Sequence, residues 1–307
     1  MSTNYKLSPT QREIVSGLTA GFVTTSVTHP LDLLKIRLQL DASNTTVVSS
    51  TRRIISSLRK ESPIKTLKEV YRGVIPNLVG SSVAWGVYFA SYRYVKDAFH
   101  FLAQPTIDPL VADFSPKTNK DSTLRAYHYL SSAFIAGSFT ALVTNPIWVL
   151  KTRILSTSSS TPGAYTGLID GIKRVLKEEG IFGFWKGLVP SLLGVSQGAL
   201  QFTVYDSLKY HWLKSDERQL KVWEYIAVSC VSKIVAAVTL YPCQVLKSRL
   251  QDYQSIKQRK RVRDVVWSLY HREGIRGFYK GVAPNVIRVL PATCITFTVY
   301  ESLSKVI

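Results

Sequence analysis

The sequence predicts an all-α membrane protein in which six membrane-spanning helices form three repeats. Three observations support this fold class: a block of ten residues that recurs three times, six long stretches with almost no charge, and an uneven placement of lysine and arginine. The chain has 307 residues, a net charge of +19 and a mean hydropathy of only +0.06. The prediction therefore depends on how the apolar residues are distributed and not on their total.

Each repeated block begins with a proline and places a lysine five residues later and an arginine seven residues later. The blocks read PLDLLKIRLQ from Pro30, PIWVLKTRIL from Pro146 and PCQVLKSRLQ from Pro242. Each is followed 37 to 41 residues later by an aromatic residue, a basic residue and glycine. Proline removes a helical hydrogen bond, so we expect the first long helix to kink at Pro30. We expect repeats over residues 1–100, 124–214 and 215–307, with an inter-repeat loop over residues 101–123.

Six stretches of 17 to 25 residues match the ~20 residues that a helix needs to cross a bilayer. Lys233 and Arg288 are the single cations that interrupt the last two stretches. A soluble α-helical protein is the alternative, but six such stretches are more than a globular chain of this length usually has. Gly17 and Gly21 have a spacing that predicts close approach of another helix. The stretches cover residues 14–30, 74–92, 126–150, 187–205, 225–246 and 281–300.

Basic residues are concentrated in the connections after the odd-numbered stretches. Residues 41–73, 156–187 and 251–281 hold 7, 4 and 8 lysines and arginines, whereas residues 97–125 and 210–221 hold three each. The positive-inside tendency places the odd connections in one compartment and both termini in the other. Each odd connection also contains a segment that predicts a short amphipathic helix on the membrane surface. The basic run KQRKRVR would suit nucleic acid, but beside a membrane it needs no such partner.

The residue types do not indicate an enzyme. The sequence has no recognisable nucleophile arrangement, metal cluster or glycine loop for phosphate. Cys230, Cys243 and Cys294 all fall inside apolar stretches and have no zinc spacing. The first thirteen residues have no apolar core, so we expect targeting information to be internal.

These motifs resemble the signature of the mitochondrial carrier family, which is proline-x-acid-x-x-basic-x-basic, then acid-glycine, then aromatic-basic-glycine. The resemblance covers the chain from end to end. Glu179-Gly180 and Glu273-Gly274 keep the acid-glycine pair, but Lys65-Thr66 stands there in repeat 1. The resemblance implies six helices in three pairs, which are related by pseudo-threefold symmetry and surround a water-filled central cavity in the inner mitochondrial membrane. It also implies that the odd connections face the matrix and that both termini lie in the intermembrane space.

In that family, the acid of one block pairs with the lysine of the next block and closes the matrix end. Here Asp32 is the only such acid, because Trp148 and Gln244 occupy the other two positions. The resemblance therefore implies a weak matrix gate in which Asp32 faces Lys151. A partial gate is implied at the opposite, cytosolic side. The matrix gate would comprise Asp32, Lys35, Lys151, Lys247 and the bracing Gln39 and Gln251, and the cytosolic-side gate Lys96, Asp206, Lys209 and Glu301.

Lys233 stands at a position where the other repeats have glycine. A charge inside a membrane span is costly unless it is paired or hydrated, so Lys233 is a candidate for function. The resemblance implies substrate contact at Arg288, thirteen residues before Glu301. Trp85 and Tyr88 could stack on an aromatic ring, with helix packing as the equal alternative. The full candidate substrate set is Lys233, Arg288, Trp85, Tyr88, Gly80, Leu193, Gly194 and Gln197.

The segments AWGVYF and KGLVPSLLGVSQGALQF resemble the FAD and folate carriers of the nucleotide branch. The resemblance implies transport of FAD, an anionic small molecule, with no bound cofactor. Folate, NAD and pyrimidine nucleotide carriers are the alternatives within transport, and a substrate-less scaffold or proton-leak protein is the alternative outside it. We also expect a monomer that binds cardiolipin. The expected lipid-binding residues are Arg72, Gly73, Lys186, Gly187, Lys280 and Gly281.

Overall fold

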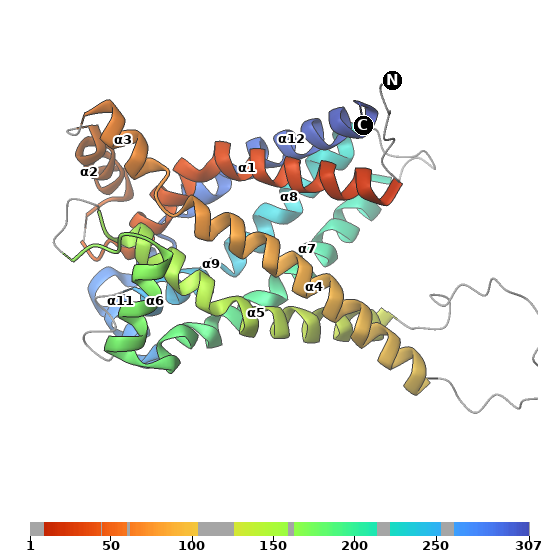
Figure 1. Ribbon diagram of the computed structural model, residues 1–307. Coiled ribbons are helices and arrows are strands. Elements are labelled where there is room, and N and C mark those ends of the chain that lie inside the picture. Colours follow the sequence, from red (N-terminus) through yellow and green to blue (C-terminus); the bar gives the residue numbers. More distant parts are fainter. Residues whose placement is uncertain are drawn as a thin grey trace, which may run out of the picture.

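The computed structural model describes residues 9–43, 45–59, 62–103, 126–158, 163–213, 222–252 and 261–306 (Figure 1). Every regular element in these residues is a helix. The elements are α1 (Pro9–Leu40), α2 (Val47–Arg59), α3 (Pro63–Val70), α4 (Val74–Ala103), α5 (Ala126–Ser156), α6 (Leu168–Glu179), the short 3₁₀ helix η3 (Ile181–Trp185), α7 (Leu188–Leu213), α8 (Val222–Thr239), α9 (Tyr241–Gln251), α11 (Val262–Gly277) and α12 (Val282–Val306).

The long helices pack as a closed ring in the order α1, α4, α5, α7, α8 and α12, with α12 returning to α1. The most extensive contacts join α4 to α5, α1 to α12 and α7 to α8. These are the contacts between successive repeats, so the repeats hold one another together. The start of α1 and the end of α12 lie at the same end of the molecule (Figure 1).

The prolines of the three blocks have different effects on their helices. Pro30 lies inside the continuous helix α1, and Pro146 lies inside α5. In the third block the chain breaks at Leu240, and α8 and α9 meet with a bend of 56°. Pro242 then occupies the first turn of α9, where its missing N–H leaves no helical bond unmade. The kink was expected at Pro30, but the helix break lies in the third repeat.

The short helices α2, α6 and α11 gather at the end opposite the helix termini described above (Figure 1). They belong to the basic odd connections. Buried apolar clusters form at this end, where the blocks meet one another and the short helices. The clusters are Leu33 with Ile36 and Leu155, Leu150 with Val175 and Phe184, and Tyr241 with Val245 and Leu269.

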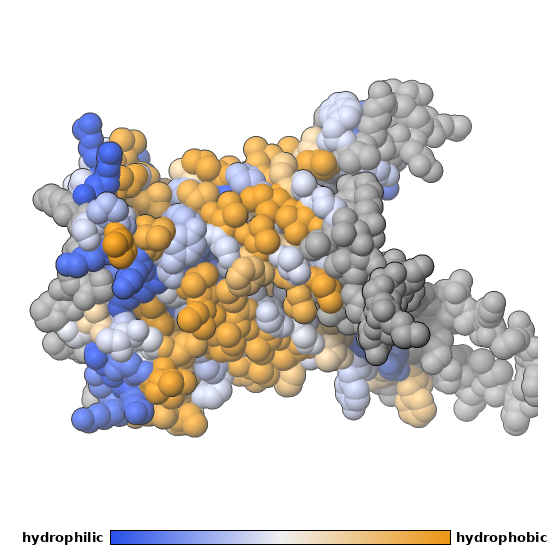
Figure 2. All heavy atoms as spheres, turned by 45° about the horizontal axis from the view of Figure 1, so that its top comes forward, coloured by the Kyte–Doolittle hydropathy of each residue, from blue (hydrophilic) through white to orange (hydrophobic). Residues whose placement is uncertain are grey.

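The face shown in Figure 2 carries a broad apolar band across the middle of the molecule, with hydrophilic residues at the end that bears the short helices. Large apolar side chains such as Phe22, Phe89 and Phe139 are exposed. An apolar surface of this extent indicates contact with a membrane or a protein. By length and hydropathy alone, helix Tyr127–Ser156 is able to cross a membrane, and α8 with α9 qualifies if the bent pair is one span. The other long helices among the described residues contain too many polar residues to meet the same hydropathy criterion.

The expected close approach at Gly17 and Gly21 was wrong. Both residues are exposed, and a Cβ atom at either would have no neighbour within 4 Å. The tight contact lies instead at Gly137, where a Cβ atom would come within 2.6 Å of Val195. The spacing of small residues does not reveal which helix face meets a neighbour.

Candidate functional site

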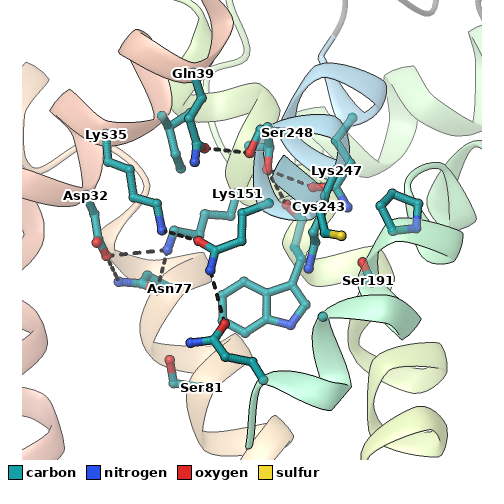
Figure 3. Close-up of a pocket in the computed structure, with 18 of the residues that line it drawn as sticks. Asp32, Lys35, Gln39, Asn77, Ser81, Lys151, Ser191, Cys243, Lys247 and Ser248 are labelled. Atoms are coloured by element: carbon teal, nitrogen blue, oxygen red, sulfur yellow. Dashed lines mark hydrogen bonds and ion pairs between the residues drawn. The ribbon is translucent and has the colours of Figure 1, made fainter. Parts of the chain in front are cut away.

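A cavity of about 540 Å³ lies between the segments that carry the three blocks (Figure 3). It is lined by residues from α1, α4, α5, α7, α9 and α12. Its charged lining consists of four cations and one carboxylate, and this excess of positive charge suits an anionic ligand. The charged residues are Lys35, Lys151, Lys247, Arg288 and Asp32.

Asp32 connects the charged groups on one side of the cavity. An Arg288 guanidinium nitrogen lies 2.7 Å from Asp32 Oδ1, and Lys151 Nζ lies 3.5 Å from Asp32 Oδ2. The amide of Asn77 donates to Asp32 Oδ2 at 3.4 Å and accepts from Lys151 Nζ at 2.7 Å. Asp32 is only 5% exposed, so its charge depends on these partners. The structure thus adds Arg288 and Asn77 to the expected pair of Asp32 and Lys151.

Lys35 binds amide oxygens in place of a carboxylate. Its Nζ donates to Gln244 Oε1 and to Asn285 Oδ1, each at 2.9 Å. Gln244, which occupies an acid position of the signature, in turn donates to Gln197 Oε1 at 3.1 Å. Hydrogen bonds from a charged donor contribute about 1.5–3 kcal/mol, so these amides stabilise the ammonium without neutralising it.

Trp148 occupies the remaining acid position, and its ring contacts two lysines. Lys151 Nζ lies 5.3 Å and Lys247 Nζ lies 5.9 Å from the ring centroid. The indole N–H donates to Thr144 Oγ1 at 3.1 Å, which fixes the ring. Cation–π contacts contribute about 0.5–2 kcal/mol and leave the positive charge in place.

Gln39 and Gln251 line the same cavity as the lysines and join different repeats. Gln39 donates to the Tyr241 hydroxyl at 3.0 Å and accepts from Ser248 at 2.7 Å. Gln251 accepts from Thr152 at 2.9 Å. Both glutamine side chains are buried and bond to hydroxyl groups, and Gln251 also donates to the Lys186 carbonyl at 3.3 Å. They brace the repeats against one another.

The sequence did not predict that the arginines of the three blocks would link the repeats in a ring. The arginine of each block donates through Nε to the carbonyl that lies nine residues after the proline of the next repeat. These carbonyls are at the C-terminal ends of helices, where cations are favoured. The bonds are Arg37 to Leu155 at 3.3 Å, Arg153 to Gln251 at 3.3 Å and Arg249 to Gln39 at 2.6 Å.

Each ring arginine also forms an ion pair with a buried glutamate of its own repeat. Arg153 and Arg249 bind the expected acids Glu179 and Glu273, at 2.6 and 2.7 Å. Arg37 binds Glu69, which lies one helical turn beyond the position where the signature has its acid. The missing acid of repeat 1 is therefore supplied from α3. The signal in the sequence was the arginine that recurs in every block. An arginine at the same place in all three blocks implies an acidic partner in each repeat.

Of the residues expected to contact substrate, Arg288, Gly194 and Gln197 line the cavity. Lys233 is exposed on α8 and does not line the cavity. Leu193 is 57% exposed and also lies outside the lining. The structure therefore brings together only part of the expected set.

Gly80 has a packing role in this structure. It is buried, and a Cβ atom there would come within 3.0 Å of Ile147. Trp85 lies outside the cavity lining and stacks on Phe89 with ring centroids 5.5 Å apart, while Tyr88 meets the edge of Trp85 at 6.2 Å. These aromatic residues form a ladder along α4.

The expected cytosolic-side gate is described only in part. The Glu301 side chain, which was expected to meet Lys96, lies outside the described residues. Asp206 is exposed on α7, and no cation of the described residues lies within ion-pair distance of it.

The basic residues expected to bind lipid make bonds inside the protein. Lys280 donates to the Asp41 carbonyl at 2.8 Å, Arg72 donates to the Tyr165 carbonyl, and Lys186 lies 3.2 Å from Glu179. Lys280 and Arg72 thereby cap chain segments of the neighbouring repeat. The glycines that follow, Gly73, Gly187 and Gly281, have φ angles of 78°, 75° and 86° and directly precede α4, α7 and α12.

A ring of long helices, three copies of one motif and a cationic central cavity define a carrier-like protein, and comparison with known proteins agrees. The model of the family described as "Mitochondrial carrier protein" matches residues 6–102, 122–216 and 218–307. The chain belongs to the mitochondrial carrier family.

Named relatives carry nucleotides and cofactors. The chain is 41% identical to the mitochondrial FAD carrier protein of Saccharomyces cerevisiae, over 98% of each chain. It is 32% identical to the chloroplastic folate transporter 1 of Arabidopsis thaliana, over 95% of this chain and 94% of that one. It is 30% identical to the mitochondrial nicotinamide adenine dinucleotide transporter 1 of S. cerevisiae, over 96% of this chain and 77% of that one.

Proposed function

We propose that this protein moves FAD across the inner mitochondrial membrane by alternating access. The observation that carries the proposal is the cavity lined by four cations and one carboxylate, which favours an anionic cargo. The likeness to a yeast FAD carrier over nearly the whole chain supports a flavin nucleotide as that anion. FAD is then the transported substrate and not a cofactor.

Six spans in three repeats fit this proposal. Five of the six spans would be the continuous long helices of the ring, and the bent pair α8 and α9 would be the sixth span. The three family matches support one repeat for each match. The apolar band in Figure 2 supplies the lipid-facing surface. With the basic short helices in the matrix, both termini lie in the intermembrane space.

Arg288 would connect cargo binding to the matrix gate. It pairs with Asp32 at 2.7 Å, although it also lines the cavity and is 34% exposed. An anion that binds Arg288 competes with Asp32 and leaves that carboxylate to Lys151 and Asn77. Cargo binding would thus weaken the closure, as a ligand that favours the open state must.

A substrate panel in liposomes tests the cargo. Purified protein should take up labelled FAD, and unlabelled FAD should compete better than NAD, pyrimidine nucleotides or folate at equal concentration. Folate or NAD as the best competitor would replace FAD with that ligand. Protein that is folded but takes up no member of the panel would favour a scaffold, and proton conductance alone would favour a leak protein.

A second cavity of about 550 Å³ supports a lipid contact between repeats 1 and 2. It is lined by Gly73 at the start of α4 and by Gly167 and Leu168 at the start of α6. Helix N-termini favour phosphate groups, so cardiolipin fits this place. We propose a monomer with cardiolipin bound there. Delipidated protein should gain thermal stability on adding cardiolipin, and an equal gain with a neutral lipid would count against the site.

A further inference from the structure

Lys247 differs from the two equivalent lysines of the cavity. All three stand five residues after the proline of their block. Lys35 donates to two amide oxygens, and Lys151 binds Asn77 and the carboxylate of Asp32. For Lys247, the described residues provide neither a hydrogen-bond acceptor nor a carboxylate within ion-pair distance, although it lines the cavity.

The residue at the acid position explains this difference. Each lysine faces the acid position of the preceding repeat in the ring, and the three residues there differ in chemistry. Asp32 offers Lys151 a charge, and Gln244 offers Lys35 an amide oxygen. Trp148 offers Lys247 only a ring face, 5.9 Å away. The ring holds the ammonium near it but leaves its three N–H donors unoccupied.

We infer that Lys247 binds a phosphate group of the cargo. This deepens the proposed function and depends on it for the identity of the cargo. An ammonium with free donors beside a cavity supplies the charge and the hydrogen bonds that a phosphate oxygen needs. The surroundings add polar groups without adding negative charge, because Ser191 and Ser248 line the same part of the cavity (Figure 3). Lys247 is thus a specificity-determining residue as well as a member of the gate.

Transport kinetics compare Lys247→Gln with Lys35→Gln, which removes the same charge from an equivalent position. Lys247→Gln should raise the KM for FAD about tenfold or more, since a hydrogen bond to a charged group is lost at the cargo. Lys35→Gln should raise it much less. Inhibition by ADP should weaken in Lys247→Gln, while inhibition by riboflavin, which has no phosphate, should not. Equal KM values in the two variants would overturn the inference. If the wild type transports another solute and not FAD, the proposal of FAD as cargo is rejected. The labelling measurement below then tests the phosphate site at Lys247 independently.

Labelling of Cys243 gives a measurement that does not depend on the cargo. Cys243 lines the cavity four residues before Lys247, on the same face of α9. In protein with Cys230→Ser and Cys294→Ser, inorganic pyrophosphate should slow the reaction of Cys243 with a charged methanethiosulfonate reagent. The protection should be lost in Lys247→Gln and kept in Lys35→Gln. Absence of protection in the starting protein, or its persistence in Lys247→Gln, would contradict a phosphate site at Lys247.

Discussion

Asp32 holds two cations and an amide, so at the scale of single residues its removal should have a large effect. In Asp32→Asn, Arg288 and Lys151 lose their only carboxylate among the described residues. Breaking a buried pair costs about 3–5 kcal/mol, so the Tm of the purified protein should fall clearly. The matched control is Asp170→Asn, which removes a more exposed i,i+4 pair with Arg174 that contributes ~0–1 kcal/mol. Equal Tm values for the two variants would show that Asp32 is not the centre of the network.

Glu69 offers a second test at the residue scale. If it replaces the acid of repeat 1, Glu69→Gln should lower the Tm about as much as Glu179→Gln, because each breaks a buried pair with an arginine of the ring. Glu178→Gln changes an exposed neighbouring acid and should leave the Tm nearly unchanged. Differential scanning fluorimetry of the three variants is sufficient. A Tm for Glu69→Gln equal to that of the exposed control would reject the replacement.

At the scale of elements, α12 begins after a glycine whose backbone conformation and close packing do not suit a larger residue. Gly281 precedes α12 with φ +86°, and a Cβ atom there would lie 2.9 Å from the Lys35 carbonyl oxygen. Gly274 in α11 has φ +64° but open space around it. Both Gly→Ala changes cost about 1–2 kcal/mol of backbone strain, and only Gly281→Ala adds a clash between repeats. Gly281→Ala should therefore lower the Tm more than Gly274→Ala, and the reverse order would contradict the close packing of α12 on α1.

The elements themselves were largely predictable, because their signals are local. Apolar stretches and repeated prolines indicated the long helices, and the short amphipathic segments were observed as α2, α6 and α11. The rotation of each helix was not predictable. Gly17 and Gly21 face outward, whereas Gly80 is packed against Ile147, since the neighbour across a helix interface is not encoded in spacing along one chain.

For the whole molecule, the site was predictable where threefold repetition applies and unpredictable where the repeats differ. The family resemblance implied that Asp32 would face Lys151, as it does. It did not indicate that Arg288 would share Asp32, because Arg288 has no charged equivalent in the other repeats. The difference between repeats is also where specificity is expected, since a symmetric cavity would offer three identical contacts to an asymmetric cargo.

Uptake of labelled FAD into liposomes by the wild type and by Arg288→Ala tests the central claim most directly, namely that the cationic cavity is an anion transport site. The wild type should take up FAD. Arg288→Ala should lose uptake but still fold and insert, because Asp32 keeps Lys151 and Asn77 as partners. Lys173→Ala, an exposed change on α6, should keep it. Full uptake by folded Arg288→Ala would contradict the claim.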